Sequence, residues 1–216
     1  QEMALLQEQG EPGGQVLYPL VDEHWRRARA PEEAVARLLA SAQGEIFPSI
    51  HLGGYSVLAG TPGGVARLLK ELPPLKLGAT SYPFRLAQHG PYHTPLASGV
   101  AARAKEQLAR LEFRAPAIAL VDGRGARFTP AATDLDALRA YTLGEQIDTP
   151  YDFTSSVRVA TLEYAPERLV LLGPGNTLGG VCAQVLIELG WRGLASKEDF
   201  ERVQASDAPV IESLRR

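Results

Sequence analysis

"LAQHGPYHTPLASG", residues 86–99, places His89 and His93 four positions apart with a Gly-Pro pair between them. Histidines at this spacing share one face only when the segment is an α-helix. Glycine and proline both interrupt helices, and proline also favours extended backbone in the residue before it. No Asp, Glu or Cys follows nearby at a ligand spacing, so we expect no metal ion here. The stretch instead indicates a loop that leads into a new helix at Thr94 and Pro95.

His93 stands directly before the start of this expected helix. The partial positive charge at a helix N-terminus disfavours a protonated imidazole, so the position favours the neutral ring. A neutral imidazole is the form that accepts a proton as a general base near pH 7. A loop histidine that only forms a hydrogen bond fits the same position, and spacing alone leaves both interpretations open.

The chain before residue 88 alternates between extended and helical patterns. Strand patterns cover 15–21, 45–60 and 80–87, the last with a half-buried alternation of Tyr82, Phe84 and Leu86. Helical patterns cover 30–44 and 61–74, and each has a proline in its first turn. Two helices among three or four strands predict a split-βαβ, ferredoxin-like subdomain.

From residue 94 the pattern changes to helices separated by short strands. We expect a long helix whose single apolar face carries Leu96, Val100, Ala104, Leu108 and Leu111. Residues 116–130 indicate two strands around a glycine-rich turn, in which Asp122, Arg124 and Arg127 are expected to be exposed. Further helices are expected over 132–146 and 155–166, and 167–190 indicates a buried strand, a tight turn and a helix.

Composition excludes several classes of protein. The 216 residues are 45% hydrophobic, which is enough for a sizeable core. A net charge of −3 does not suggest a nucleic-acid partner, and no run approaches the roughly 20 apolar residues of a membrane span. Cys182 is the single cysteine, so the chain forms no internal disulfide, and a reducing, cytoplasmic location is expected.

Four motifs carry a resemblance to a known family. They are "YPFRLAQHGPYHTP" with the helix and strand that follow (82–125), "EQIDTPYDFTSSV" (145–157), "LVLLGPGNTLGGV" (169–181) and, upstream, "IHLGGYSVLAG" (50–60). In this order and with these gaps they resemble malonyl-CoA:acyl-carrier-protein transacylases and polyketide acyltransferase domains, most strongly over 46–181. The resemblance implies a layered α/β acyltransferase core, incomplete at its N-terminus, with an inserted ferredoxin-like α+β subdomain. It assigns 1–13 to the end of a core helix, 14–87 to the subdomain and 88–216 to the C-terminal part of the core.

The resemblance also implies an activity and three site residues. The family passes malonyl from coenzyme A to acyl carrier protein through an acyl-serine, in fatty-acid or polyketide biosynthesis. His93 matches its general base, and Gln146 matches the glutamine whose backbone carbonyl orients that histidine. Tyr92 matches a position where a large aromatic ring favours malonyl by filling the space of an α-methyl group. Malonyl-CoA and acyl carrier protein are the implied partners; the coenzyme A thioester is a substrate, and no cofactor is implied.

The family's nucleophilic serine has no match in this chain. It lies in a Gly-His-Ser-x-Gly elbow, and none of the ten serines here has glycine both two residues before and two residues after it. The arginine that binds the malonyl carboxylate and the first oxyanion donor would also precede Gln1. We expect the missing segment upstream in the same protein, and the chain alone to be inactive. A separate chain carrying that segment, or a non-catalytic relative that binds coenzyme A or a carrier protein, are the alternatives.

Two further features allow a functional and a structural interpretation. "GPGNTLGG" (173–180) has the placement of a dinucleotide-binding turn, but Leu178 stands where the third glycine belongs, which favours a plain strand–helix turn. Arg26, Arg27 and Arg29 form a basic cluster. Such a cluster suits either a solvated face or the docking of an acidic carrier protein.

Overall fold

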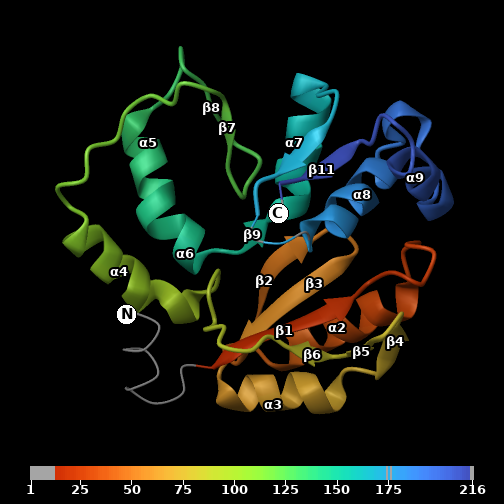
Figure 1. Cartoon of the computed structure of the whole chain (residues 1–216). Helices are drawn as coiled ribbons and strands as arrows, with labels where there is room; N and C mark the ends of the chain where they lie inside the picture. The colour runs from red at the N-terminus through yellow and green to blue at the C-terminus, as the bar shows by residue number, and fades with distance from the viewer. Residues whose placement is uncertain (1–12, 174, 176, 215–216) are drawn as a thin grey trace.

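The computed structural model describes residues 13–173, 175 and 177–214 (Figure 1). Its centre is a five-stranded sheet with the order β6-β1-β3-β2-β9. The strands are β1 (Gly14–Pro19), β2 (Ile46–Leu52), β3 (Tyr55–Gly60), β6 (Phe84–Arg85) and β9 (Tyr151–Asp152). The first four pair antiparallel, whereas β9 joins β2 in parallel from far along the chain. The helix end expected over 1–13 lies outside the described residues except for its last position.

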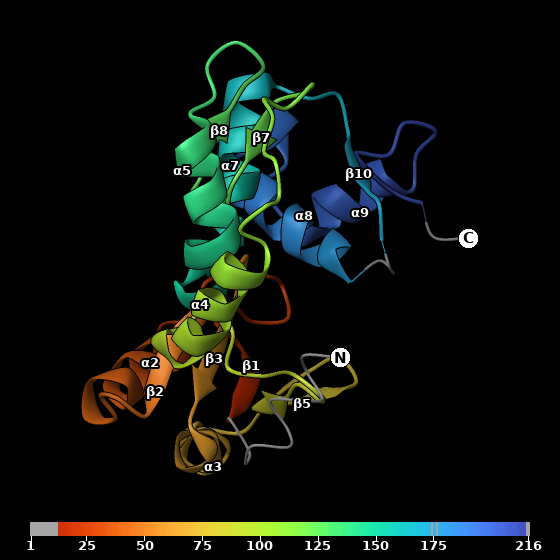
Figure 2. The same ribbon diagram turned by 90° about the vertical axis from the view of Figure 1, so that its left-hand side faces the viewer.

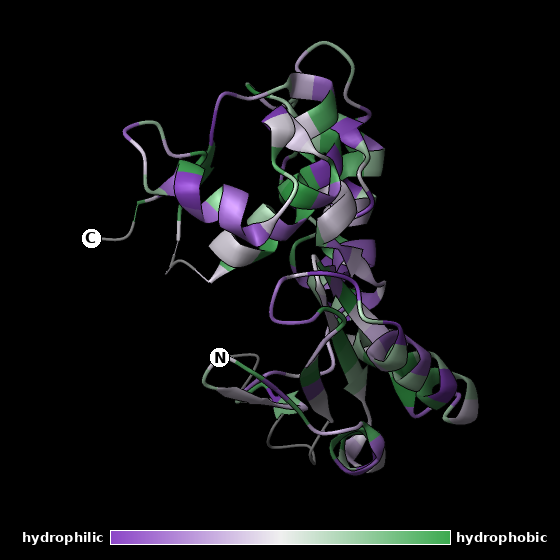
Figure 3. Cartoon of the chain, turned by 90° about the vertical axis from the view of Figure 1, so that its right-hand side faces the viewer, coloured by the Kyte–Doolittle hydropathy of each residue, from purple (hydrophilic) through white to green (hydrophobic). Residues whose placement is uncertain are grey.

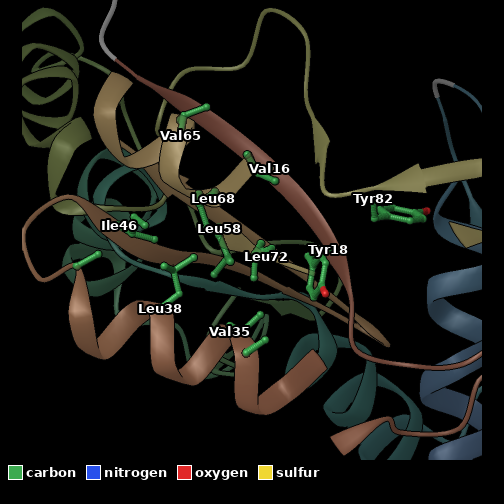
Figure 4. Packing of buried hydrophobic residues seen from close by; sticks show 12 residues of the cluster. Val16, Tyr18, Val35, Leu38, Ile46, Leu58, Val65, Leu68, Leu72 and Tyr82 are labelled. Atoms are coloured by element: carbon green, nitrogen blue, oxygen red, sulfur yellow. The ribbon is translucent and has the colours of Figure 1, made fainter. Parts of the chain in front are cut away.

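Helices α2 (Arg29–Ser41) and α3 (Pro62–Glu71) pack on one face of this sheet (Figure 4). Successive side chains of a strand point to opposite faces, so Val16 and Tyr18 enter this core while Gln15 projects from the other face. Leu58 of β3 and Leu68 of α3 are completely buried. The helices mix hydrophobic and hydrophilic residues (Figure 3), as expected for helices with one covered side.

The topology of this region is the one that the sequence predicts. Along the chain the strands of the sheet and its helices run β1-α2-β2-β3-α3-β6, with a separate strand pair between α3 and β6. Across the sheet the order is β6-β1-β3-β2, which is a split-βαβ arrangement. Gly53, in the turn between β2 and β3, has a φ of +61°, a conformation that favours glycine. The Thr61 hydroxyl accepts a hydrogen bond from the Gly64 N–H at 3.1 Å and caps α3. The position of the domain boundaries stays a prediction.

The strand predicted over 80–87 is divided in two. β5 (Thr80–Tyr82) pairs with β4 (Leu75–Leu77), and β6 pairs with β1. Pro83 stands between them and has no N–H to donate to a sheet ladder, which explains the interruption. Tyr82 is buried, but Phe84 is 46% exposed, so the half-buried alternation is wrong for Phe84. Among the described residues, the two-residue β6 lies at the edge of the sheet, with β1 as its single partner strand.

The rest of the chain extends from the sheet as helices α4 (Ser98–Gln107), α5 (Leu135–Ala140) and α7 (Phe153–Tyr164). Beside them lie α8 (Leu178–Glu188), α9 (Lys197–Gln204) and β10 (Leu169–Leu171) (Figures 1 and 2). A second core forms around α8, with Ala183, Val185 and Leu186 fully buried and Phe200 of α9 against them. Among the described residues, no helix is both long and apolar enough to cross a bilayer. The remaining elements of this part of the chain are η1 (Pro95–Ala97), β7 (Leu120–Val121), β8 (Arg127–Phe128), η2 (Tyr141–Glu145), α6 (Gln146–Asp148), η3 (Trp191–Gly193) and β11 (Ile211–Ser213).

The apolar face predicted for the helix after Thr94 is wrong. The segment begins as the short 3₁₀ turn η1, and α4 ends at Gln107. Ala97 and Ala101 are the buried positions, whereas Leu108 and Leu111 are 44% and 48% exposed. Because α4 packs closely against η2 and α6, its contact face carries small residues rather than the leucines that the periodicity selects.

Two expectations about burial are also wrong. The predicted hairpin forms, and Arg124 and Arg127 are exposed as expected. Asp122 in its turn is buried, where its carboxylate accepts hydrogen bonds from the N–H groups of Arg124 and Ala126. The strand predicted to be buried near residue 170 forms β10, yet Val170 is 45% exposed and Leu172 is 78% exposed. In the described part of the chain, only β11 pairs with β10, so this strand lacks the neighbours that its apolar sequence favours.

Candidate active site

The loop that carries both histidines crosses the face of the sheet opposite α2 and α3. Gln15 of β1 and Ser49 of β2 project from that face and are almost completely buried. The Ser49 hydroxyl donates a hydrogen bond to the Tyr92 carbonyl at 2.9 Å and accepts one from Gln15 Nε2 at 2.8 Å. Gln15 Nε2 also lies 3.3 Å from the Tyr92 carbonyl, and its Oε1 lies 3.0 Å from His89 Nδ1. These polar contacts fix the loop between His89 and Tyr92 on the sheet.

The sequence reasoning missed this support. Gln15 and Ser49 are polar residues within otherwise apolar strand segments, which is the one signal that could have identified them. A buried polar side chain needs hydrogen-bond partners, so each such position indicates a partner on the same face. Without the strand register, the sequence does not reveal that the two side chains meet.

His93 is bound to the protein through both its backbone and its ring. Its N–H donates to the Ile147 carbonyl at 2.7 Å, and its Nδ1 lies 2.7 Å from the Gln146 carbonyl. A carbonyl oxygen only accepts, so Nδ1 carries the proton and Nε2 keeps a lone pair. The backbone of His93 has a φ of +59°, in a region that costs a residue with a side chain about 1–3 kcal/mol. The two hydrogen bonds compensate for this strain at the candidate site.

The Gln146 carbonyl is available for a local reason. Helix α6 contains only Gln146–Asp148, so its last carbonyls lack intrahelical donors. The residue four positions after Gln146 is Pro150, which has no N–H. The carbonyl therefore accepts from His93 instead, and the sequence "EQIDTP" builds an acceptor that faces the ring.

The environment of His93 lowers its pKa. Partial burial of the ring disfavours the imidazolium form and is the main cause, while the hydrogen bond to Gln146 raises the pKa and offsets part of this effect. The sequence reasoning reaches the same neutral imidazole through the helix N-terminus, but burial is the cause that the structure supplies. Thr94 does not cap the next helix, because its hydroxyl donates to the Pro91 carbonyl at 2.6 Å.

A pocket of about 260 Å³ opens beside the loop. Its volume exceeds the roughly 30 Å³ of a water molecule several-fold, so it has room for a small acyl group. The Tyr92 ring packs on Gly90, where an added Cβ would lie 3.2 Å from the ring. His89 and His93 both line this pocket. Its other lining residues are Gln15, Ile50, Gln88 and Tyr92.

Tyr151 and Gly123 complete the surroundings of His93. The Tyr151 and His93 ring centroids lie 5.5 Å apart. Tyr151 also packs on Gly123, where an added Cβ would come within 2.4 Å of the ring. An aromatic ring therefore lies beside the imidazole at this point of the candidate site.

Other candidate residues remain apart from the site. In the described part of the chain, no serine hydroxyl forms a hydrogen bond with the His93 ring. Histidines, cysteines and acidic residues do not gather in groups of three that could hold a metal ion, as far as the described residues extend. Arg27 pairs with Glu32 and Glu188, and Arg29 pairs with Glu33, so much of the basic cluster is neutralised within the chain. In "GPGNTLGG", Pro174 and Asn176 lie outside the described residues.

Comparison with known proteins gives matches in structure only. No family model matches the sequence, and no curated protein matches it. An acyl carrier protein S-malonyltransferase from Vibrio cholerae O1 biovar eltor matches with a TM-score of 0.65 and 22% identity, over 98% of this chain and 59% of that chain. The malonyl-CoA:ACP transacylase of Synechocystis sp. PCC 6803 has a TM-score of 0.70 and 12% identity, over 100% and 60%. A malonyl-transacylase in complex with its type II polyketide synthase acyl-carrier protein matches with a TM-score of 0.66 and 20% identity, over 99% of this chain and 58% of that chain.

The chain therefore has an acyltransferase fold over the region that it spans, and the predicted mixed α/β class is confirmed. Within that class, the three matched structures are those of malonyl-transferring enzymes. The resemblance inferred from the four motifs is thus confirmed at the level of the fold. The chain spans about three fifths of the length of these three structures, so their activity does not pass to it with the fold.

Proposed function

We propose that the protein is an acyl-carrier-protein S-malonyltransferase in which His93 is the general base. The observation that carries the proposal is the 2.7 Å contact between His93 Nδ1 and the Gln146 carbonyl. It leaves the lone pair on Nε2, on a ring that lines the pocket. Burial keeps this imidazole neutral near pH 7, which is the protonation state that a general base requires. In this proposal Gln146 orients the ring, as the aspartate does in a Ser-His-Asp triad.

The proposed reaction has two balanced steps. In the first, His93 Nε2 takes the proton of a serine hydroxyl while the serine oxygen attacks the thioester carbonyl of malonyl-CoA. The tetrahedral intermediate breaks its carbon–sulfur bond, and the coenzyme A sulfur leaves with the proton from the imidazolium. In the second step His93 takes the proton of the carrier protein's thiol, and that sulfur attacks the acyl-serine. The serine oxygen then leaves with the proton, and the base is restored.

The nucleophile of this reaction lies outside the given chain. None of its serines has the flanking glycines of a nucleophile elbow, and Ser49, beside the His93 loop, is already bonded to Gln15 and Tyr92. We therefore place the serine, the carboxylate-binding arginine and the first oxyanion donor in a segment upstream of Gln1. Tyr92, which lines the pocket, limits the space beside the acyl α-carbon and so favours malonyl. Cytoplasmic location and docking of an acyl carrier protein belong to the same proposal.

The test is acylation of the protein that includes the upstream segment. After incubation with malonyl-CoA, intact-mass spectrometry should show one malonyl group on the wild-type protein and none on His93→Ala. His24→Ala is the matched control, because His24 is a surface histidine near Glu23 and Glu198. Retained acylation of His93→Ala would refute the role of His93. A wild-type protein that binds malonyl-CoA without becoming acylated would support the non-catalytic alternative instead.

A further inference from the structure

The hairpin between β7 and β8 reaches the residues that orient His93. We propose that Arg124, in the turn of this hairpin, is a positioning residue for His93 that acts through Glu145 and the Gln146 carbonyl. The inference rests on the proposed function for its catalytic consequence. Its structural part, the orientation of the His93 ring, stands on contacts within the chain and is tested separately.

Arg124 is held in place by its own turn. The buried Asp122 accepts hydrogen bonds from Arg124 Nη2 at 2.6 Å and from Nε at 2.9 Å through one carboxylate oxygen. Its other oxygen accepts from the N–H groups of Arg124 and Ala126 at 2.8 and 2.9 Å. Hydrogen bonds between two charged groups are stronger than neutral ones, and two of them to one oxygen hold the guanidinium beside the turn.

The guanidinium of Arg124 contacts the π-helical turn η2 at its first and its last residue. Arg124 Nη1 donates to the Glu145 carboxylate at the last residue of the turn. The guanidinium carbon lies 4.6 Å from the ring centroid of Tyr141 at the first residue, which is a cation–π contact. The Tyr141 hydroxyl in turn accepts the Gly123 N–H of the same hairpin at 2.7 Å. The hairpin and η2 therefore form one connected polar unit.

The end of η2 adjoins the residue that contacts the imidazole. Glu145 is the residue before Gln146 in the chain, and the Gln146 carbonyl accepts a hydrogen bond from His93 Nδ1. η2 and α6 continue α5 without a break and form the last turns of this helical segment, where the carbonyls lack intrahelical donors. The position of the Gln146 carbonyl thus depends on neighbours, and Arg124 supplies the polar contact at the adjoining residue.

A solvated salt bridge on the same hairpin provides the contrast. Arg127 pairs with Glu163 at 2.7 Å, and both side chains are about half exposed. An exposed pair of this kind contributes little and has no connection to His93. Arg124 and Glu145 are also partly exposed, at 39% and 45%. Arg124 differs because its other carboxylate partner, Asp122, is only 3% exposed and because three of its nitrogens have partners.

The test measures which ring nitrogen of His93 carries the proton. Nitrogen-15 NMR of histidine distinguishes the two tautomers, and His93→Ala identifies the signals among those of the four histidines. In the wild type, the proton should reside on Nδ1. In Arg124→Gln, the ratio of the Nε2–H to the Nδ1–H tautomer should rise roughly fivefold, the factor that corresponds to the net loss of one hydrogen bond. Arg127→Gln should leave the ratio unchanged.

Two further variants separate geometry from charge and from folding. Arg124→Lys should behave like Arg124→Gln, because a single ammonium cannot bind Asp122 through two nitrogens and also reach Glu145. If Arg124→Gln does not fold, Glu145→Gln removes only the charge pair between Arg124 and Glu145 and should show the same change of tautomer. A tautomer ratio in Arg124→Gln or Glu145→Gln equal to that of Arg127→Gln would overturn the proposal.

Kinetics of the protein with its upstream segment distinguish this inference from the proposed function. Arg124→Gln should lower kcat for malonyl transfer roughly tenfold with KM for malonyl-CoA unchanged, since a misplaced base slows only the chemical step. A changed tautomer in a protein that transfers no malonyl group would refute the function and support the positioning. Full transfer activity in Arg124→Gln, with the wild-type tautomer, would refute the positioning alone.

Discussion

Replacing Ser49 by alanine should release the loop that carries His93. Ser49 is fully buried on the sheet, and its hydroxyl both donates to the Tyr92 carbonyl at 2.9 Å and accepts from Gln15 Nε2 at 2.8 Å. The change removes one oxygen atom and leaves these two buried groups without that partner. Tyr92 is the residue before His93, so loss of the contact acts directly on the candidate site.

The expected magnitude follows from the number of groups left unpaired. A buried polar group without its partner costs about 1–3 kcal/mol. Gln15 Nε2 still lies 3.3 Å from the Tyr92 carbonyl and compensates for part of the loss, so we expect a destabilisation of about 2 kcal/mol. With a urea dependence of about 2.5 kcal/mol per molar, the unfolding midpoint should fall by roughly 0.8 M.

Urea unfolding followed by circular dichroism measures this shift. Ser56→Ala on the adjacent β3 is the matched control, because Ser56 is 7% exposed and its hydroxyl forms no hydrogen bond with the described residues. Its midpoint should change by less than about 0.2 M, since removal of a hydroxyl without a partner costs little. Equal shifts for the two variants would show that the Gln15–Ser49–Tyr92 contacts do not stabilise the loop.

Three further predictions concern the walls of the site. All three effects can be measured by unfolding or by transfer assays. Burial lowers the pKa of His93 below its usual 6.5, so the folded state favours the neutral ring. The contribution of the neutral ring to stability is present above pH 6.5 and is lost as the pH falls, and His93→Gln should remove that part of the pH dependence of urea unfolding. Gly123→Ala places a Cβ 2.4 Å from Tyr151 and should cost about 1–3 kcal/mol in thermal unfolding, whereas Gly179→Ala, with its nearest atom at 3.7 Å, should not destabilise. Tyr92→Ala, in the protein with its upstream segment, should raise the transfer of methylmalonyl relative to malonyl roughly tenfold.

Each of these three has a contrary outcome. A His93 pKa at or above 6.5 in an NMR titration would contradict the buried ring. Equal melting temperatures for Gly123→Ala and Gly179→Ala would mean that Tyr151 moves without cost. An unchanged methylmalonyl-to-malonyl ratio in Tyr92→Ala would remove Tyr92 from acyl selection.

Local signals in the sequence predicted the sheet region well. The Thr61-Pro62 pair gives the start of α3, and the glycines at 53 and 54 give the turn between β2 and β3. Such signals work because capping and left-handed backbone depend on the residue itself. Pro83 carried a similar signal against a continuous strand over 80–87, and the alternation of apolar residues concealed it.

The candidate site was only partly accessible to such reasoning. His93 and Gln146 came from motifs, and the structure adds the reason for their contact, which is the missing N–H at Pro150. Asp122 was expected to be exposed, as turn aspartates usually are. Its burial depends on Arg124 and on two backbone N–H groups that only the folded turn brings together. A contact between residues distant in sequence, such as Gln15 with Ser49, can be predicted only when the register of the strands is known. The pattern of each segment alone does not give that register.

β10 shows why burial is harder to predict than secondary structure. The apolar run "LVLL" (169–172) correctly indicates a strand, because its residue types suit extended backbone. Its burial depends on what packs against it, and parallel strands are normally covered on both faces. In the described part of the chain β10 has one partner strand, and Leu172 is 78% exposed, as are Leu162 at 63% and Leu214 at 59%. The sequence therefore predicts the strand itself, whereas its burial depends on packing partners that the apolar run does not specify.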